Sequence, residues 1–150
     1  MFGEKLSEYI QFERWILILV AVAFVIRLVI SVAGTPFAET RWVSINLVLL
    51  VRLIYCSIAV HTSGFGSYKQ LFGLLLVQNV FAHTCIALGI AIAIVTGREN
   101  AFTVPEVSGG GNGATWFHAL LHLFGGFIAP VFFWIIGSAI LFVTKKLSRA

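Results

Sequence analysis

The chain has 150 residues, of which 59% are hydrophobic and only 11% are charged, about half the charged share of a soluble domain. A water-soluble domain of this length could not bury so much apolar surface, so lipid must solvate part of it. The net charge of +4 is spread along the chain without a basic stripe. We therefore expect contact with anionic lipid headgroups and no binding to nucleic acid.

Residues 1–14 come first and mix charged with apolar side chains. This pattern is typical of a short amphipathic helix that lies on the membrane surface. All six acidic residues of the chain are glutamates, and we place none of them inside a long apolar segment: Glu4, Glu8, Glu13, Glu39, Glu99 and Glu106. The first apolar segment is too long for the core of a signal peptide, so we expect it to be retained.

Four long apolar segments follow one another. We expect transmembrane helices at about residues 15–34, 42–61, 71–96 and 116–143, because about 20 helical residues cross the hydrocarbon core. The predicted fold class is an all-α integral membrane protein. Residues 1–150 would form one membrane domain, a bundle of four transmembrane helices surrounded by the lipid bilayer.

Two arginines lie inside the first two segments. Arg27 lies near the end of the first segment, so we expect its long side chain to reach the headgroups. Arg52 lies near the middle of the second segment, where a charge costs at least about 2.5 kcal/mol on insertion scales. With no carboxylate in the segments to neutralise it, Arg52 must find backbone carbonyls, a water-filled cavity, an anionic ligand or an acid on another protein.

The third segment carries three polar side chains close together, those of Gln78, Asn79 and His83. Asn79 and His83 are four residues apart and share a helix face. Such groups commonly form hydrogen bonds between membrane helices, and with the two arginines they are candidates to contact a partner or ligand. Gly89 and Ala93, also four apart, favour close packing with another helix.

The two cysteines, Cys56 and Cys85, lie within the second and third segments. A buried thiol behaves as a small hydrophobic group, so we expect neither a disulfide nor a redox role. The longest loop follows the third segment and covers residues 97–115. Four glycines in its second half, Gly109, Gly110, Gly111 and Gly113, make it the stretch where we expect the greatest flexibility.

The fourth segment begins with HALLH, in which His118 and His122 are four residues apart. Two histidines at this spacing can share a metal ion, but a zinc site needs a third protein ligand. We expect His83 to lie several ångströms deeper in the membrane, out of reach of both. We favour hydrogen-bonded histidines near the membrane surface, with haem or another pigment bound through His118, His122 and His83 as one alternative and a metal ion as another.

Motifs of known catalysis do not occur in the sequence. We find no GxSxG elbow, no phosphate-binding loop and no dinucleotide fingerprint before a helix. The chain contains no aspartate, a residue widely used for acid–base and two-metal catalysis. We therefore expect no intrinsic catalysis and assign no catalytic residue.

Four segments place both termini on one side of the membrane. Six basic residues then share that side: Lys5, Arg14, Lys69, Lys145, Lys146 and Arg149. Two basic residues share the other side, Arg41 and Arg98. This excess predicts that both termini lie in the cytoplasm, and we expect the membrane to be a bacterial inner membrane.

Residues 61–76, HTSGFGSYKQLFGLLL, form a glycine-rich turn that leads into an apolar segment. They resemble the glycine-glycine-x-glycine-serine-phenylalanine turn of the Yip-type polytopic membrane proteins. The matching residues are Gly64, Gly66, Ser67, Tyr68 and Lys69. This chain differs from that family in its number of membrane-spanning segments: it has four, whereas five are typical of the family. It implies a membrane scaffold or a trafficking-type role and no known reaction.

Three classes of function follow from the sequence. The first is a small non-catalytic subunit or scaffold of a larger membrane complex, favoured by an Arg52 that lacks a partner and by the absence of a soluble domain. Its partners would be other membrane subunits or a second copy. The second is a haem- or quinone-binding electron-transfer subunit that uses the membrane histidines. The third is a small transporter or channel, with an anion path lined by Arg52, Gln78, Asn79 and His83.

Overall fold

The computed structural model describes residues 1–148. Helices account for 77% of it, and this part of the chain contains no strand. The helices are α1 (Leu6–Val32), α2 (Phe37–Thr40), α3 (Ile45–Thr62), α4 (Tyr68–Thr96), α5 (Pro105–Ser108) and α6 (Trp116–Leu147). Four of them are long and apolar enough to cross a membrane, namely α1, α3 together with the preceding α2, α4 and α6. The predicted bundle of four membrane helices is confirmed.

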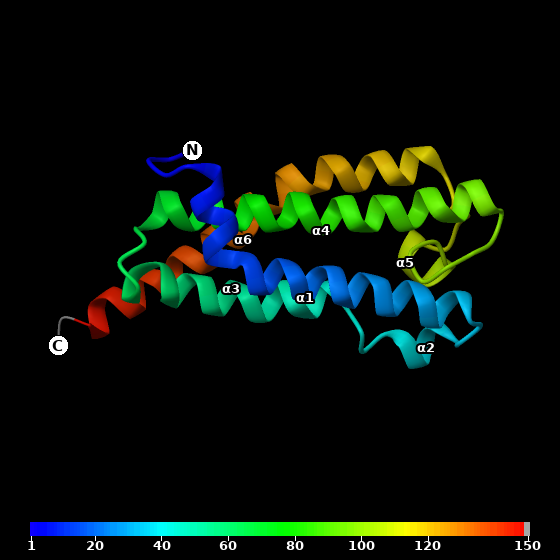
Figure 1. Ribbon diagram of the computed structural model, residues 1–150, viewed down its shortest axis with the longest axis horizontal. Helices are drawn as coiled ribbons and strands as arrows, with labels where there is room; N and C mark the ends of the chain where they lie inside the picture. The colour runs from blue at the N-terminus through cyan, green and yellow to red at the C-terminus, as the bar shows by residue number, and fades with distance from the viewer. Residues whose placement is uncertain (149–150) are drawn as a thin grey trace.

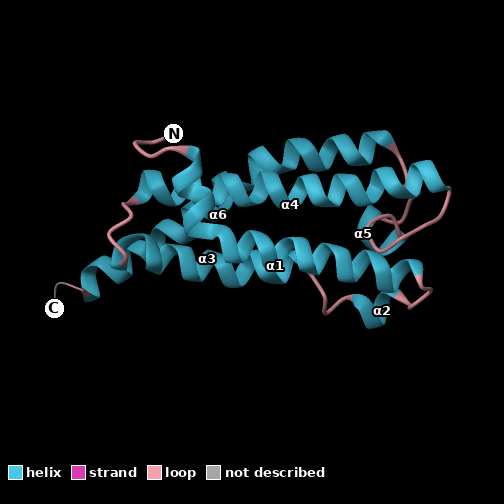
Figure 2. Ribbon diagram, viewed as in Figure 1, coloured by secondary structure: helices cyan, strands magenta, loops and turns pink. Residues whose placement is uncertain are grey.

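The four long helices run side by side (Figure 1). The N-terminus, the end of α6 and the turn between α3 and α4 lie at one end of the bundle, which we call the terminal end. The short helices α2 and α5 lie at the opposite end, the loop end. Figure 2 shows that loops occur mainly at these two ends.

The first helix begins earlier than the sequence predicts. Residues 6–14 are the first turns of α1 and not a separate surface helix. They pack inward because Tyr9 and Glu13, one turn apart, are both 0% exposed. The expectation that no carboxylate lies inside a membrane segment is therefore wrong, since the carboxylate of Glu13 is buried in the bundle.

Helix α4 is the centre of the bundle and packs against α1, α3 and α6. Its contact with α6 depends on glycine. A Cβ atom added at Gly126 would lie 3.1 Å from the Cβ of His83 and 3.3 Å from the Cα of Val80. The absent side chain allows the two helix backbones to approach closely, as small residues do in membranes.

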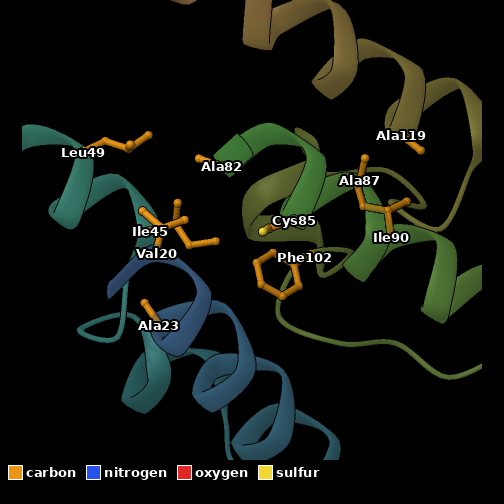
Figure 3. Close-up of a cluster of buried hydrophobic side chains, with 10 residues drawn as sticks. All are labelled: Val20, Ala23, Ile45, Leu49, Ala82, Cys85, Ala87, Ile90, Phe102 and Ala119. Carbon is orange, nitrogen blue, oxygen red and sulfur yellow. The ribbon is translucent and has the colours of Figure 1, made fainter. Parts of the chain in front are cut away.

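Two clusters of buried apolar side chains hold the helices together. Figure 3 shows the first cluster, toward the loop end: Val20, Ala23, Ile45, Leu49, Ala82, Cys85, Ala87, Ile90, Phe102 and Ala119. The second includes Tyr9, Leu53, Cys56, Val60, Leu71, Leu74, Leu75 and Leu141. Both cysteines are free and buried within these clusters, as small hydrophobic groups are.

The long loop folds back into the bundle. Asn100, Phe102 and Thr103 are almost completely buried, and the Nδ2 atom of Asn100 donates a hydrogen bond of 2.7 Å to the Gly89 carbonyl oxygen of α4. A Cβ atom at Gly89 would lie 2.5 Å from the Phe102 ring. Gly89 therefore receives an aromatic ring from the loop instead of a neighbouring helix. The first half of the predicted flexible loop is packed against α4.

Candidate functional site

Polar side chains follow the inner face of α4 and meet polar groups from the other three long helices. We call this set the polar column. It consists of Tyr9, Glu13, Arg52, Gln78, Asn79, His83, His122 and His118. The side chains of its first five residues, Tyr9, Glu13, Arg52, Gln78 and Asn79, are 0% or 1% exposed. The three histidines are partly buried. The structure thus gathers the polar residues that the sequence places on separate segments.

The centre of the column, in the half of the bundle toward the terminal end, contains the buried side chains of Arg52 and Glu13. The Nε atom of Arg52 donates a bond of 3.3 Å to the Leu49 carbonyl oxygen, whereas both terminal nitrogens of Arg52 and both carboxylate oxygens of Glu13 lack a hydrogen-bond partner. No hydrogen bond joins the two groups, so any interaction between them is electrostatic and acts over a longer distance. The expectation that Arg52 has no acid within its own chain is wrong, because Glu13 supplies one.

Two amides extend the column along α4. The Nε2 atom of Gln78 donates to the sulfur of Cys56 on α3 at 3.9 Å, whereas the Nδ2 atom of Asn79 donates to its own helix, at the Leu75 carbonyl oxygen. The side-chain oxygens of both amides have no partner. Buried polar atoms are normally hydrogen-bonded, so these oxygens mark positions where water or a ligand group would bind favourably.

Three histidines complete the column. The Nδ1 atoms of His83 and His122 are 3.3 Å apart, and the ring centres of His122 and His118 are 5.0 Å apart. The Nδ1 atom of His118 lies 2.8 Å from the Gly113 carbonyl oxygen. The expectation that His83 lies too deep to meet the other two is wrong.

The folded-back loop explains this error. Thr96 at the end of α4 lies 13 residues, or about 20 Å, beyond His83. Trp116 at the start of α6 lies only six residues, or about 9 Å, before His122. Because residues 100–103 pack back against α4, α6 begins about 10 Å below the end of α4, and the two histidines lie at one level.

The hydrogen bonds constrain the protonation of these rings. A carbonyl oxygen can only accept, so His118 carries its hydrogen on Nδ1. In the contact between His83 and His122, one Nδ1 atom carries a hydrogen and the other accepts it. The second nitrogen of each ring of this pair is left to exchange a proton with a neighbouring group.

The facing Nδ1 atoms of His83 and His122 leave no room for a haem iron between them. An iron between two imidazoles needs a metal–nitrogen bond of about 2 Å on each side, and the facing nitrogens of His83 and His122 already lie at hydrogen-bond distance. Within residues 1–148, no group of three or more His, Cys, Asp or Glu side chains has the arrangement to hold a metal ion.

A polar cavity of about 260 Å³ lies beside the histidines at the loop end, with Arg27, Asn46 and His122 in its walls. Arg27 is only 8% exposed. It donates to the Val43 carbonyl oxygen at 3.4 Å, and its guanidinium lies over the Phe102 ring. Its charge lies under the folded-back loop at the loop end of the bundle, and the expectation that its side chain extends to the headgroups stays a prediction.

The sequence prediction missed the two column members on α1. Tyr9 and Glu13 are followed by Ile16 and Val20 at helical spacing, which continues one face of α1 from its first turn. The mixture of charged and apolar side chains near Met1 suggests a surface segment, but this periodicity was the signal that residues 6–14 belong to the bundle.

Comparison of the chain with protein-family models, with curated proteins and with solved structures finds no match. The resemblance of residues 61–76 to the Yip-type turn stays a prediction. In the structure Gly64 has a φ of 72°, and Ser67 and Gln70 form a capping box at the start of α4.

Proposed function

We propose that the protein carries protons across its membrane along the polar column. The observation that supports this best is the continuity of the column from Tyr9 at the terminal end to His118 at the loop end. Ionisable side chains inside membrane proteins are costly, and chains of Glu and His are characteristic of proton relays.

The first part of the relay lies on α1. The Tyr9 hydroxyl donates to the Met1 carbonyl oxygen at 3.0 Å and lies one helical turn from Glu13. The Glu13 carboxylate can accept a proton to become a neutral acid and release it again. Arg52 stabilises the charged form when the proton leaves, which keeps the group able to cycle.

The amides of Gln78 and Asn79 connect this acid to the histidines. They cannot ionise, but their unpaired oxygens can hold water molecules that pass a proton on. At the far end, a proton that arrives on Nδ1 of one histidine produces an imidazolium, which can then lose the hydrogen from its Nε2 atom. The pair of His83 and His122 can relay a proton in this way to the polar cavity at the loop end.

A proton relay fits the column better than the anion path expected from the sequence. Glu13 and the three histidines can each take up and release a proton, a property that a relay needs and an anion path does not. A relay requires only side chains and water at hydrogen-bond distances, so the close packing of α4 against α6 does not prevent it.

The test is proton flux into liposomes that contain the purified protein and a pH-sensitive dye, driven by a potassium diffusion potential. We expect Glu13→Gln and His83→Gln each to lower the flux by at least about tenfold, a typical contribution of a proton-transferring group. The control is His61→Gln, a histidine at the terminal end of α3 outside the column, which should keep full flux. Wild-type flux in folded Glu13→Gln and His83→Gln proteins would disprove the relay.

A small subunit or scaffold of a larger membrane complex is the second candidate. The observation that favours it is the low burial of the apolar segments of α1 and α6, 17% and 22%, which leaves broad apolar faces open to lipid or to another membrane protein. The mass and composition of the particle extracted from its native membrane in mild detergent test it. A fixed ratio of other chains supports a subunit, and a particle of this chain alone argues against it.

The orientation belongs to the same proposal. We infer that the terminal end faces the cytoplasm of a bacterium and that the loop end faces the outside of its inner membrane. Lys5, Lys69, Lys145 and Lys146 lie toward the terminal end, and Arg149 lies outside the described residues. This basic excess follows the positive-inside rule. Protons would then pass between the cytoplasm and the cavity near His122.

A further inference from the structure

The polar cavity at the loop end contains a cation that no acidic side chain neutralises. Arg27 lines this cavity of about 260 Å³, although the residue is only 8% exposed. Among the described residues, no carboxylate interacts with its guanidinium. An isolated charge inside a membrane protein is costly, so the cavity suits a ligand of the opposite charge.

Two aromatic rings hold the guanidinium in place without neutralising it. Its central carbon lies 5.2 Å from the centre of the Phe37 ring and 5.7 Å from the centre of the Phe102 ring. Such cation–π contacts stabilise the charge but do not accept its N–H groups in the way that a carboxylate oxygen does. The orientation of Arg27 is therefore fixed before a ligand arrives.

The hydrogen bonds of Arg27 leave one terminal nitrogen available. Nη1 donates to the Val43 carbonyl oxygen at 3.4 Å, and Nε is enclosed by protein without a partner. Nη2 forms no hydrogen bond within residues 1–148, and it is not among the atoms that the protein encloses. Nη2 is thus a free, charged donor on a residue that lines the cavity.

Two further polar side chains line the same cavity, those of Asn46 on α3 and His122 on α6. The amide of Asn46 has two N–H donors. The Nδ1 atom of His122 contacts His83, and when it accepts the hydrogen of His83, the ring hydrogen of His122 is on Nε2 and can be donated. Three helices therefore bring donors to one cavity around a single permanent positive charge.

The walls of the cavity indicate which anion fits. Because Arg27 is their only permanent charge, one negative charge balances it and a dianion leaves an excess. The planar guanidinium matches the geometry of a carboxylate. The rest of the lining is apolar and suits a hydrocarbon chain better than a hydrated inorganic ion: Ile45, Ile86, Ala101, Phe102 and Val107. Pockets for drug-sized ligands measure about 300–1,000 Å³, so this cavity suits a smaller molecule.

We propose that this cavity binds a small aliphatic monocarboxylate, of the size of butyrate. Its carboxylate accepts hydrogen bonds from Arg27, with Asn46 and His122 as further donors, and its short chain packs against the apolar walls. This inference does not rest on the proton relay, because Arg27 lies outside the polar column and binding needs no proton transfer.

The test is fluorine NMR of 4,4,4-trifluorobutyrate with the full-length protein in nanodiscs of phosphatidylcholine, with empty nanodiscs as the blank. We expect saturable broadening of the fluorine signal that butyrate reverses. Butyramide has nearly the same shape without the charge, and chloride has the charge without the chain, so neither should reverse it at the same concentration. Absence of saturable broadening, or equal displacement by butyramide or chloride, would overturn the proposal.

Arg27→Gln should lower the affinity by at least about tenfold, the effect of lost hydrogen bonds to a charged donor. The variant leaves no acid unpaired, so we expect it to fold. Arg41→Gln is the matched control, because Arg41 is an exposed arginine at the same end of the bundle, where it lies over Trp42 and outside the cavity. Unchanged affinity in Arg27→Gln, or an equal loss in Arg41→Gln, would overturn the site.

A second variant keeps the charge and removes the space. Val107 lines the cavity and is 39% exposed, so Val107→Trp can be accommodated at the rim and should abolish the displaceable broadening. Full binding in this variant would contradict the cavity as the site. Binding is measured without a membrane potential or a pH gradient, so its outcome and that of the proton-flux assay are independent.

Discussion

The Nδ1 atoms of His83 and His122 lie 3.3 Å apart, although 39 positions separate the two residues in the chain. Two glycines of α6 make this contact possible. A Cβ atom at Gly125 would lie 3.2 Å from the His83 ring, and one at Gly126 would lie 3.1 Å from its Cβ atom. The histidine pair therefore exists because α6 presents bare backbone to α4 at this level.

This contact predicts measurable coupling between the two histidines. We expect a double-mutant cycle with His83→Phe and His122→Phe to give a coupling energy of about 1 kcal/mol in the free energy of unfolding, typical of one hydrogen bond. Unfolding in mixed micelles of increasing SDS content measures it. A cycle between His83 and His61, which make no contact, should give a coupling energy near zero. Strictly additive effects of the His83 and His122 substitutions would contradict the contact.

The buried charges of Glu13 and Arg52 predict a compensating double variant. Arg52→Gln alone leaves a buried carboxylate without its cation and should lower the free energy of unfolding by about 3 kcal/mol. Adding Glu13→Gln removes that lone charge, so the double variant should be more stable than Arg52→Gln. The same SDS titration measures both. If the double variant is as unstable as the sum of the two single variants, the charges do not interact.

Gly89 predicts how the long loop is held. In Gly89→Leu the new side chain would occupy the position of the Phe102 ring, so Phe102 and the loop around it should no longer pack against α4. We expect the backbone amides of residues 100–103 to exchange hydrogen much faster in this variant, as measured by mass spectrometry. Gly111→Ala is the matched control, because a Cβ atom there has open space around it. Unchanged protection in Gly89→Leu would show that the loop is held elsewhere.

The proposed orientation predicts opposite labelling of two engineered cysteines. In a Cys56→Ser, Cys85→Ala background, Ser63→Cys at the terminal end should react with a membrane-impermeant maleimide only after the cells are opened. Gly111→Cys at the loop end should react in intact cells. The reverse pattern would invert the orientation. Reaction of both cysteines in intact cells would contradict the placement of residues 63 and 111 at opposite ends of the bundle.

The sequence predicts the four membrane helices well because long apolar runs have few alternatives to helix in lipid. The predicted ends of the helices differ from the structure where polar residues are buried, as at the start of α1. Glu13 looks like part of a surface segment, since its charge outweighs the apolar face that it shares with Tyr9 and Val20. Only the packing of α1 against the bundle shows that this face is internal.

The site residues were recognisable by type but not by contact. Arg52, Gln78 and the histidines all stand out as polar groups in apolar segments. Their meeting depends on the level of each helix in the membrane, which the loop between α4 and α6 sets. Asn100 and Phe102 fix that level by packing on α4. The pattern of apolar residues in the sequence does not predict that the loop folds back in this way.

The offset between α4 and α6 has an electrical consequence. At the loop end, the side of the bundle formed by α6 is lower than the side formed by α4 by about 10 Å, and the bilayer adapts to a shorter hydrophobic wall by thinning beside it. The polar cavity near His122 deepens this recess. The transmembrane voltage falls across the region of low dielectric constant, so the electric field is steeper where a thinner bilayer meets the side of the bundle formed by α6.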